Sequence, residues 1–136
     1  MSKSYLKYCK DFIIDNLEGY KNNYIYMCDL GNYITEGINV DGSATYSTYE
    51  AKEYIKEWFD EAGEVYQYQK DNYGECLHNP FEHPEAFHVC MIIEGVNNIL
   101  NQCETIQKYC NDEKELNKKL INKIIKEVKQ IESIEF

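Results

Sequence analysis

The fold is decided by residues 84–110, which read PEAFHVCMIIEGVNNILNQCETIQKYC. Apolar side chains recur there every three or four residues, which is the spacing of one face of an α-helix. The predicted inward positions are Val89, Ile92, Val96, Ile99, Cys103, Ile106 and Cys110. Proline suits the first position of a helix, because the amide that it lacks has no partner there. We therefore expect one long helix over residues 84–110 at the centre of the molecule.

Two segments nearer the N-terminus also have helical spacing. Residues 3–18 are followed by Gly19, a stop signal. Their inward residues are Leu6, Cys9, Ile13 and Leu17. Residues 24–36 predict a second helix that ends at Gly37. Its inward residues are Tyr26, Met27, Leu30 and Ile34. A short strand is the alternative, because β-branched and aromatic residues favour strands, and Asp41-Gly42 favours a small hairpin near residues 38–46.

Two more helices are expected in the remainder of the chain. The sequence Ser47-Thr48-Tyr49-Glu50 is a capping box and begins a long helix that runs to about Tyr73. Asn111 or Asp112 caps a last helix that continues toward Phe136. Its apolar seam is formed by Leu116 or Leu120, then Ile121, Ile124, Val128 and Ile131. No proline-rich or serine-rich linker divides the chain, so residues 1–136 are predicted to form a single all-α domain, a bundle of four or five helices.

Composition restricts the class of partner. The 14 basic residues are all lysine and face 24 acidic residues, which gives a net charge of −10. Such a chain repels phosphate and has no arginine to form bidentate contacts with bases, so direct nucleic-acid binding is not expected. No apolar run is long enough for a membrane span, and residues 1–9 lack an apolar signal core, so we expect a cytoplasmic protein without membrane contact.

The negative charge is concentrated in one predicted helix. Glu50, Glu53, Glu57, Asp60, Glu64 and Asp71 follow helical spacing, and Glu61 lies close by. They cluster about 160° around the helix from the apolar stripe, with about 5 to 6 Å between successive members. This row resembles the phosphates of a nucleic-acid strand, so it predicts a binding surface for a basic protein groove. The exposed tyrosines Tyr46, Tyr49, Tyr54 and Tyr68 would add contact area. A solvated face that adds solubility, or ion pairing with lysines of the last helix, is the alternative.

Histidine and cysteine gather in residues 76–90. A zinc site could draw on Cys76, His78, His83 and either His88 or Cys90, but the spacing matches no common finger or ribbon. Ordinary loop and core roles are the alternative, and we expect no metal and no cofactor. The sequence contains no phosphate-binding glycine loop, no Gly-x-Ser-x-Gly and no His-Glu-x-x-His, so we do not expect an enzyme.

Three stretches resemble small acidic proteins of phages and mobile elements in low-GC Gram-positive bacteria. They are NVDGSATYSTYEAKEYI at residues 39–55, NPFE at residues 79–82 and FHVCMIIE at residues 87–94. Such proteins include the anti-CRISPR proteins, several of which resemble nucleic acid and occupy the DNA-binding groove of an effector. The resemblance implies a non-enzymatic inhibitor of a basic host protein, a CRISPR effector above all. A helical module that forms a homodimer through the seam of the last helix is a second hypothesis, and a zinc-stabilised domain is a third.

Overall fold

The chain folds into an all-α single-domain bundle, as predicted, but the expected four or five helices are seven in the described part, because two of the predicted helices are broken. The computed structural model describes residues 4–45, 48–74, 80 and 82–136, and that part contains seven α-helices and no β-strand. The α-helices are α1 (Tyr5–Gly19), α2 (Leu30–Thr45), α3 (Thr48–Glu57), α4 (Phe59–Tyr73), α5 (Pro84–Gln102), α6 (Glu104–Tyr109) and α7 (Lys118–Gln130). Two short 3-10 helices, η1 (Tyr20–Asn22) and η2 (Met27–Asp29), lie between α1 and α2. No helix in the described part is long and apolar enough to cross a membrane.

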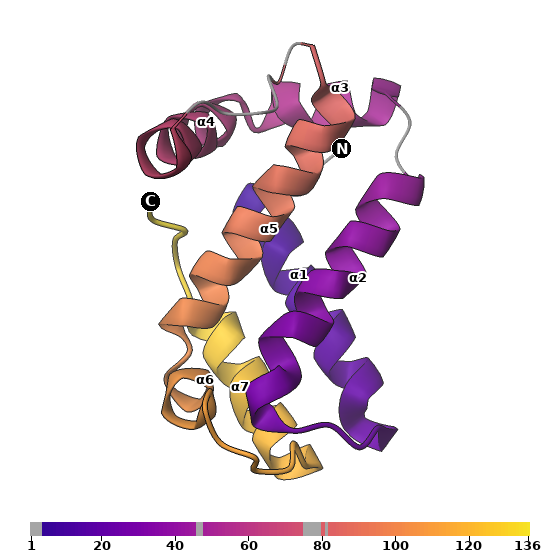
Figure 1. Cartoon of the computed structure of the whole chain (residues 1–136), viewed down its shortest axis with the longest axis vertical. Helices are drawn as coiled ribbons and strands as arrows, with labels where there is room; N and C mark the ends of the chain where they lie inside the picture. Colours follow the sequence, from indigo (N-terminus) through magenta and orange to yellow (C-terminus); the bar gives the residue numbers. More distant parts are fainter. Residues whose placement is uncertain (1–3, 46–47, 75–79, 81) are drawn as a thin grey trace.

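Helix α5 is the central element, as expected from its apolar face. It packs against α1, α2, α3, α4 and α6, and Figure 1 shows it running through the middle of the bundle. Pro84 occupies its first turn, as predicted. Helix α1 packs closely on α5 at Gly95, where an added Cβ would lie 2.6 Å from the Tyr5 hydroxyl oxygen and 2.7 Å from the Cys9 sulfur. Glycine is therefore required for this contact.

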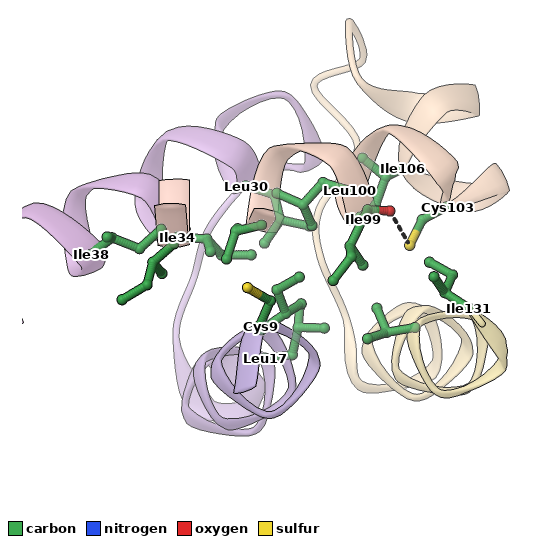
Figure 2. Close-up of a cluster of buried hydrophobic side chains, with 14 of the residues drawn as sticks. Cys9, Leu17, Leu30, Ile34, Ile38, Ile99, Leu100, Cys103, Ile106 and Ile131 are labelled. Atoms are coloured by element: carbon green, nitrogen blue, oxygen red, sulfur yellow. Dashed lines mark hydrogen bonds between the residues drawn. The ribbon is translucent and has the colours of Figure 1, made fainter. Parts of the chain in front are cut away.

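The core brings together apolar side chains from most of the helices. Figure 2 shows Cys9 and Leu17 of α1 facing Leu30 and Ile34 of α2 and Ile99 of α5. The Cys103 thiol donates a hydrogen bond to the carbonyl of Ile99 at 3.4 Å, and burial raises the pKa of this thiol to about 12. It therefore stays neutral and acts as an apolar side chain. The described cysteines form no disulfide with one another.

The expected helix over residues 84–110 is broken in the structure. Cys103 has φ −81° and ψ 114°, and its extended backbone separates α5 from α6. Glu127 of α7 accepts hydrogen bonds from both the amide and the hydroxyl of Thr105, the first at 2.9 Å. This carboxylate satisfies donors in the first turn of α6, so a new helix can begin there.

The prediction for residues 24–36 was wrong at both ends. Residues 24–29 are not α-helical: residues 24–26 lie outside any helix and Met27–Asp29 form η2, because this segment pairs with residues 112–116. The amide of Met27 donates to the carbonyl of Lys114 at 2.8 Å, and the amide of Leu116 donates to the carbonyl of Ile25 at 2.9 Å. Tyr26 is exposed rather than inward. Helix α2 then runs past Gly37 to Thr45, so the hairpin does not form over residues 38–45. Burial of Leu30, Ile34 and Ile38 outweighs the roughly 1 kcal/mol that each helical glycine costs.

The last helix begins later and ends earlier than predicted. Its N-cap is Asn117, whose side chain accepts from the amide of Leu120 at 2.9 Å, rather than Asn111 or Asp112. It ends at Gln130, where the ammonium of Lys10 donates to the carbonyls of Lys129 and Ile131 at 2.9 and 2.7 Å.

The apolar seam of α7 is buried inside the chain. Leu120, Ile121, Ile124, Ile125 and Val128 are buried in the core, where α7 packs on α1 and α6. A homodimer through this seam would have to open the core, because these side chains are not exposed for contact with a second copy.

Candidate functional site

The acidic row does not lie on one straight helix. Trp58 has φ −102° and ψ 41° and separates α3 from α4, so the expected continuous helix to Tyr73 was wrong. Trp58 keeps its own helical hydrogen bonds at the break, because its amide donates to the carbonyl of Tyr54 and its carbonyl accepts from the amide of Ala62, both at 2.8 Å. The Trp58 ring is buried and stacks on His88, with 5.6 Å between ring centroids. Burial of this ring at the bend fixes the direction in which α4 leaves α3.

The α3 part of the row is mixed in charge. Glu50 and Glu57 are exposed, Glu53 is half-buried, and Lys52 and Lys56 are exposed on the same helix. Lysines beside the glutamates reduce the negative potential on this helix. The α3 residues therefore contribute less to an anionic surface than the sequence suggested.

The α4 part forms an acidic stripe. Asp60, Glu64 and Asp71 are exposed, and their mean direction lies about 150° around α4 from that of the buried residues Ala62 and Val65. Glu61 is half-buried on the flank. Lys70 lies about 90° away from the stripe by the same geometry. The outward face of α4 is thus a row of carboxylates, as predicted for this part of the chain.

The lysines of α7 do not neutralise the stripe. Lys118, Lys119, Lys123, Lys126 and Lys129 are all exposed. In the described ranges, none of them lies within 4 Å of a carboxylate, and neither Asp60, Glu64 nor Asp71 has an ion-pair partner. Asp71 instead accepts a hydrogen bond from the side chain of Gln67 at 2.8 Å. The acidic stripe therefore retains its charge, and the alternative of hidden pairing with α7 has no support here.

Residues 131–136 extend the acidic surface, and sequence reasoning missed them because it continued the last helix to Phe136. This segment, the C-terminal tail, is held on α5. The amide of Glu135 donates to the Asn98 side chain at 3.3 Å, and the Gln102 side chain donates to the carbonyl of Ser133 at 3.1 Å. The tail ends beside α4 (Figure 1), where the Phe136 ring lies 5.2 Å from that of Tyr68. Ile131 and Ile134 are three residues apart, which is also helical spacing, so the sequence held no local signal for an extended segment.

A groove separates α4 from this tail. Its larger part has a volume of about 760 Å³ and is lined by Glu64, Gln67, Tyr68, Asp71, Asn72, Ile134, Glu135 and Phe136. A smaller part of about 260 Å³ is lined by Tyr5, Leu6, Asp60, Glu61, Glu64, Glu132, Ser133 and Ile134. The two parts share Glu64 and Ile134, so we treat them as one feature, the α4–tail groove. Carboxylates from both walls, and none of the described lysines, line it.

The four tyrosines assigned to the surface have different positions. Tyr54 is half-buried and stacks on His88, with ring centroids 4.8 Å apart, so it belongs mainly to the packing around Trp58. Tyr68 is half-buried and lines the α4–tail groove. Tyr46 and the side chain of Tyr49 lie outside the described residues. Of the predicted set, Tyr68 is therefore the tyrosine that the structure places beside the acidic stripe.

The histidine and cysteine cluster is dispersed as far as the structure describes it. His88 is fully buried, His83 is exposed and Cys90 is half-buried, while Cys76 and His78 lie outside the described residues. Burial lowers the pKa of His88 to about 4. Among the described residues, no group of three or more histidine, cysteine or acidic side chains is arranged to hold a metal ion.

Comparisons with models of known protein families, with curated protein sequences and with solved structures found no match to this chain. Surface charge and shape therefore provide the evidence on function. The most distinctive surface is the α4 stripe together with the α4–tail groove.

Proposed function

We propose that this protein is a non-enzymatic inhibitor of the anti-CRISPR type, carried by a phage or mobile element. It binds the basic nucleic-acid-binding groove of a host defence protein, a CRISPR effector, and excludes DNA from that groove. Such an inhibitor acts in the cytoplasm of the host cell and has no need of a cofactor. The proposal extends the resemblance of residues 39–94 to small acidic proteins of mobile elements.

One observation supports this proposal more than any other: the carboxylates Asp60, Glu64 and Asp71 point outward without ion pairs in the described part of the chain. Asp60 and Glu64 are one helical turn apart, and neighbouring carboxylates at that spacing lie about 5 to 6 Å from each other. A rigid helix presents these charges in a fixed order, as a nucleic-acid strand presents phosphates. The net charge of −10 attracts a basic groove over a longer range.

The physical mechanism is competition for the same cations. A groove that binds DNA holds lysine and arginine side chains with associated anions, and an acidic protein surface releases those anions as DNA does. Binding should then weaken steeply as salt rises, and the inhibitor and DNA should exclude one another. A solvated acidic face without a partner predicts neither effect.

The test is binding to a purified CRISPR effector of the host, with a labelled DNA target as competitor. We expect the variant Asp60→Lys/Glu64→Lys/Asp71→Lys to lose DNA displacement, because it reverses three adjacent charges of the stripe. The matched control is Asp15→Lys/Glu36→Lys/Glu113→Lys, which reverses three exposed acids elsewhere and changes the net charge equally. If both variants weaken binding alike, only net charge matters and the stripe has no special role. Affinity that is unchanged between low and moderate salt contradicts charge mimicry altogether.

A further inference from the structure

The α4–tail groove contains aromatic rings as well as carboxylates. The Tyr68 ring lies 5.2 Å from Phe136 and 6.3 Å from Tyr73, measured between centroids. Phe136 is 40% exposed and Tyr73 is 65% exposed, so these two rings present area to solvent. Exposed aromatic groups from α4 and from the tail thus meet at one end of the groove. Clustered exposed rings of this kind are typical of binding surfaces.

The groove also has a one-sided charge. Its described lining contains carboxylates from both walls and no lysine: Asp60, Glu61, Glu64, Asp71, Glu132 and Glu135. A group that enters the groove meets aromatic surface and negative charge together. A purely apolar group gains only from the aromatic surface, and an anion is repelled by the negative charge. A cation with a flat or apolar face gains from both.

We propose that the α4–tail groove binds arginine side chains from a basic segment of the partner protein. The guanidinium group would stack on the rings at the Tyr68–Phe136 end and form hydrogen bonds with carboxylates of the walls. Arginine fits better than lysine, because its guanidinium is planar, weakly hydrated and able to pair bidentately with a carboxylate. The inference rests on the proposed function and narrows it: the partner contributes arginine to a defined groove, in addition to a general field of positive charge.

The tail is fixed before any partner arrives. Hydrogen bonds with the side chains of Asn98 and Gln102 of α5 hold the backbone of Glu135 and Ser133, and Ile134 packs against the core. The groove wall is therefore formed in the unbound protein, so binding does not need to order it. A volume of about 760 Å³ leaves room for more than one side chain. The acidic stripe alone would not provide such a preformed groove.

The test is an amide-resolved NMR titration of the whole protein with three blocked hexapeptides that alternate glycine with arginine, lysine or citrulline. Citrulline has nearly the shape of arginine without its charge. We expect the arginine peptide to shift amides around the groove, those of Gln67, Asn72 and Phe136 among them, and to bind about fivefold more tightly than the lysine peptide. The citrulline peptide should show no saturable binding.

Two variants separate stacking from charge. Phe136→Ala removes an exposed ring at the end of the tail and should weaken the arginine peptide about fivefold with little risk to folding. Phe59→Ala removes a ring that is 68% exposed on α4, outside the groove lining, and should leave binding unchanged.

The outcomes distinguish this inference from the proposed function. Equal affinity for the arginine and lysine peptides, unaffected by Phe136→Ala, overturns the groove inference. If the Asp60→Lys/Glu64→Lys/Asp71→Lys variant then still loses DNA displacement, the charge mimicry stands without the groove. Conversely, arginine-selective binding that needs Phe136 supports the groove even if the protein fails to displace DNA from an effector, a result that overturns only the proposed function.

Discussion

The buried His88 makes the stability of the bundle sensitive to mild acid. Its side chain is fully buried in α5 and stacks on the rings of Tyr54 and Trp58, at centroid distances of 4.8 and 5.6 Å, with Tyr8 at 6.1 Å. Burial disfavours the charged imidazolium and lowers the pKa from 6.5 to about 4. In the unfolded chain the same group regains its ordinary pKa.

The sign and size of the effect follow from this difference. Because the folded pKa is lowered, the unfolded state binds the proton first as the pH falls below 6.5, and the folded state is disfavoured until the pH reaches about 4. At pH 5 the loss is about 2 kcal/mol, and it approaches 3 to 4 kcal/mol below the folded pKa, at about 1.4 kcal/mol per unit. A single-domain protein has a total stability of about 5 to 15 kcal/mol. The loss at pH 5 is therefore large enough to measure.

The assay is urea unfolding at pH 7 and pH 5 for the native protein and the variant His88→Phe, which keeps an aromatic ring in the stack and cannot titrate. We expect the native protein to lose about 2 kcal/mol more than the variant between these pH values. Both proteins contain the other titrating groups, so comparing their pH responses removes the contribution of those groups. Glu94 is one of them: burial raises its pKa, so its effect on stability as the pH falls is opposite to that of His88. Equal pH dependence of native protein and His88→Phe would refute the reasoning.

Two other features give predictions that concern stability alone. Gly95→Ala should destabilise the protein by about 1 to 3 kcal/mol in thermal or urea unfolding, because its Cβ would overlap Tyr5 and Cys9 and force α1 away from α5. Gly63→Ala is the matched control on α4, where nothing lies within 4 Å of the new Cβ, and it should stabilise by about 0.5 to 1 kcal/mol; a similar sign for both changes would contradict the assigned contact. Asn117→Ala should cost about 1 kcal/mol through loss of the N-cap of α7, whereas a cap at Asn111 or Asp112 predicts no effect.

The sequence predicted the helices best where the apolar spacing was regular and the course of the helix did not depend on contacts with distant residues. Cys9, Ile13 and Leu17 of α1 and Ile92, Val96 and Ile99 of α5 are buried as expected. Breaks inside long helices were not predictable from spacing, because each depends on a distant residue. The break at Cys103 depends on Glu127 of α7, and the bend at Trp58 accompanies stacking on His88 of α5. Neither distant group has a local signal in the sequence around the break.

The same limit applies to the candidate site. Helical spacing placed Asp60, Glu64 and Asp71 on one face, and that part of the row is present on α4. It could not show that the break at Trp58 separates the α3 glutamates from this face, or that the C-terminal tail returns to α4. The tail lies there because side chains of α5 bind its backbone, an interaction between residues more than 30 positions apart. Long-range pairing of this kind is set by tertiary structure rather than by local pattern.

The distribution of charge favours one orientation toward a basic partner. The exposed lysines of α7 gather on one helix face, and α7 makes its contacts with α1 and α6 rather than with α4 (Figure 1). A molecule with net charge −10 is attracted to a cationic groove in any orientation. If α7 faced the groove, however, its lysines would lie against the basic side chains of the partner and repel them. The α4 face brings carboxylates without that repulsion, and the tail adds Glu132 and Glu135 to the same side. Under the proposed function, the lysines would act against incorrect docking while α4 would supply the attraction, and a uniformly acidic surface of equal net charge would lack this discrimination.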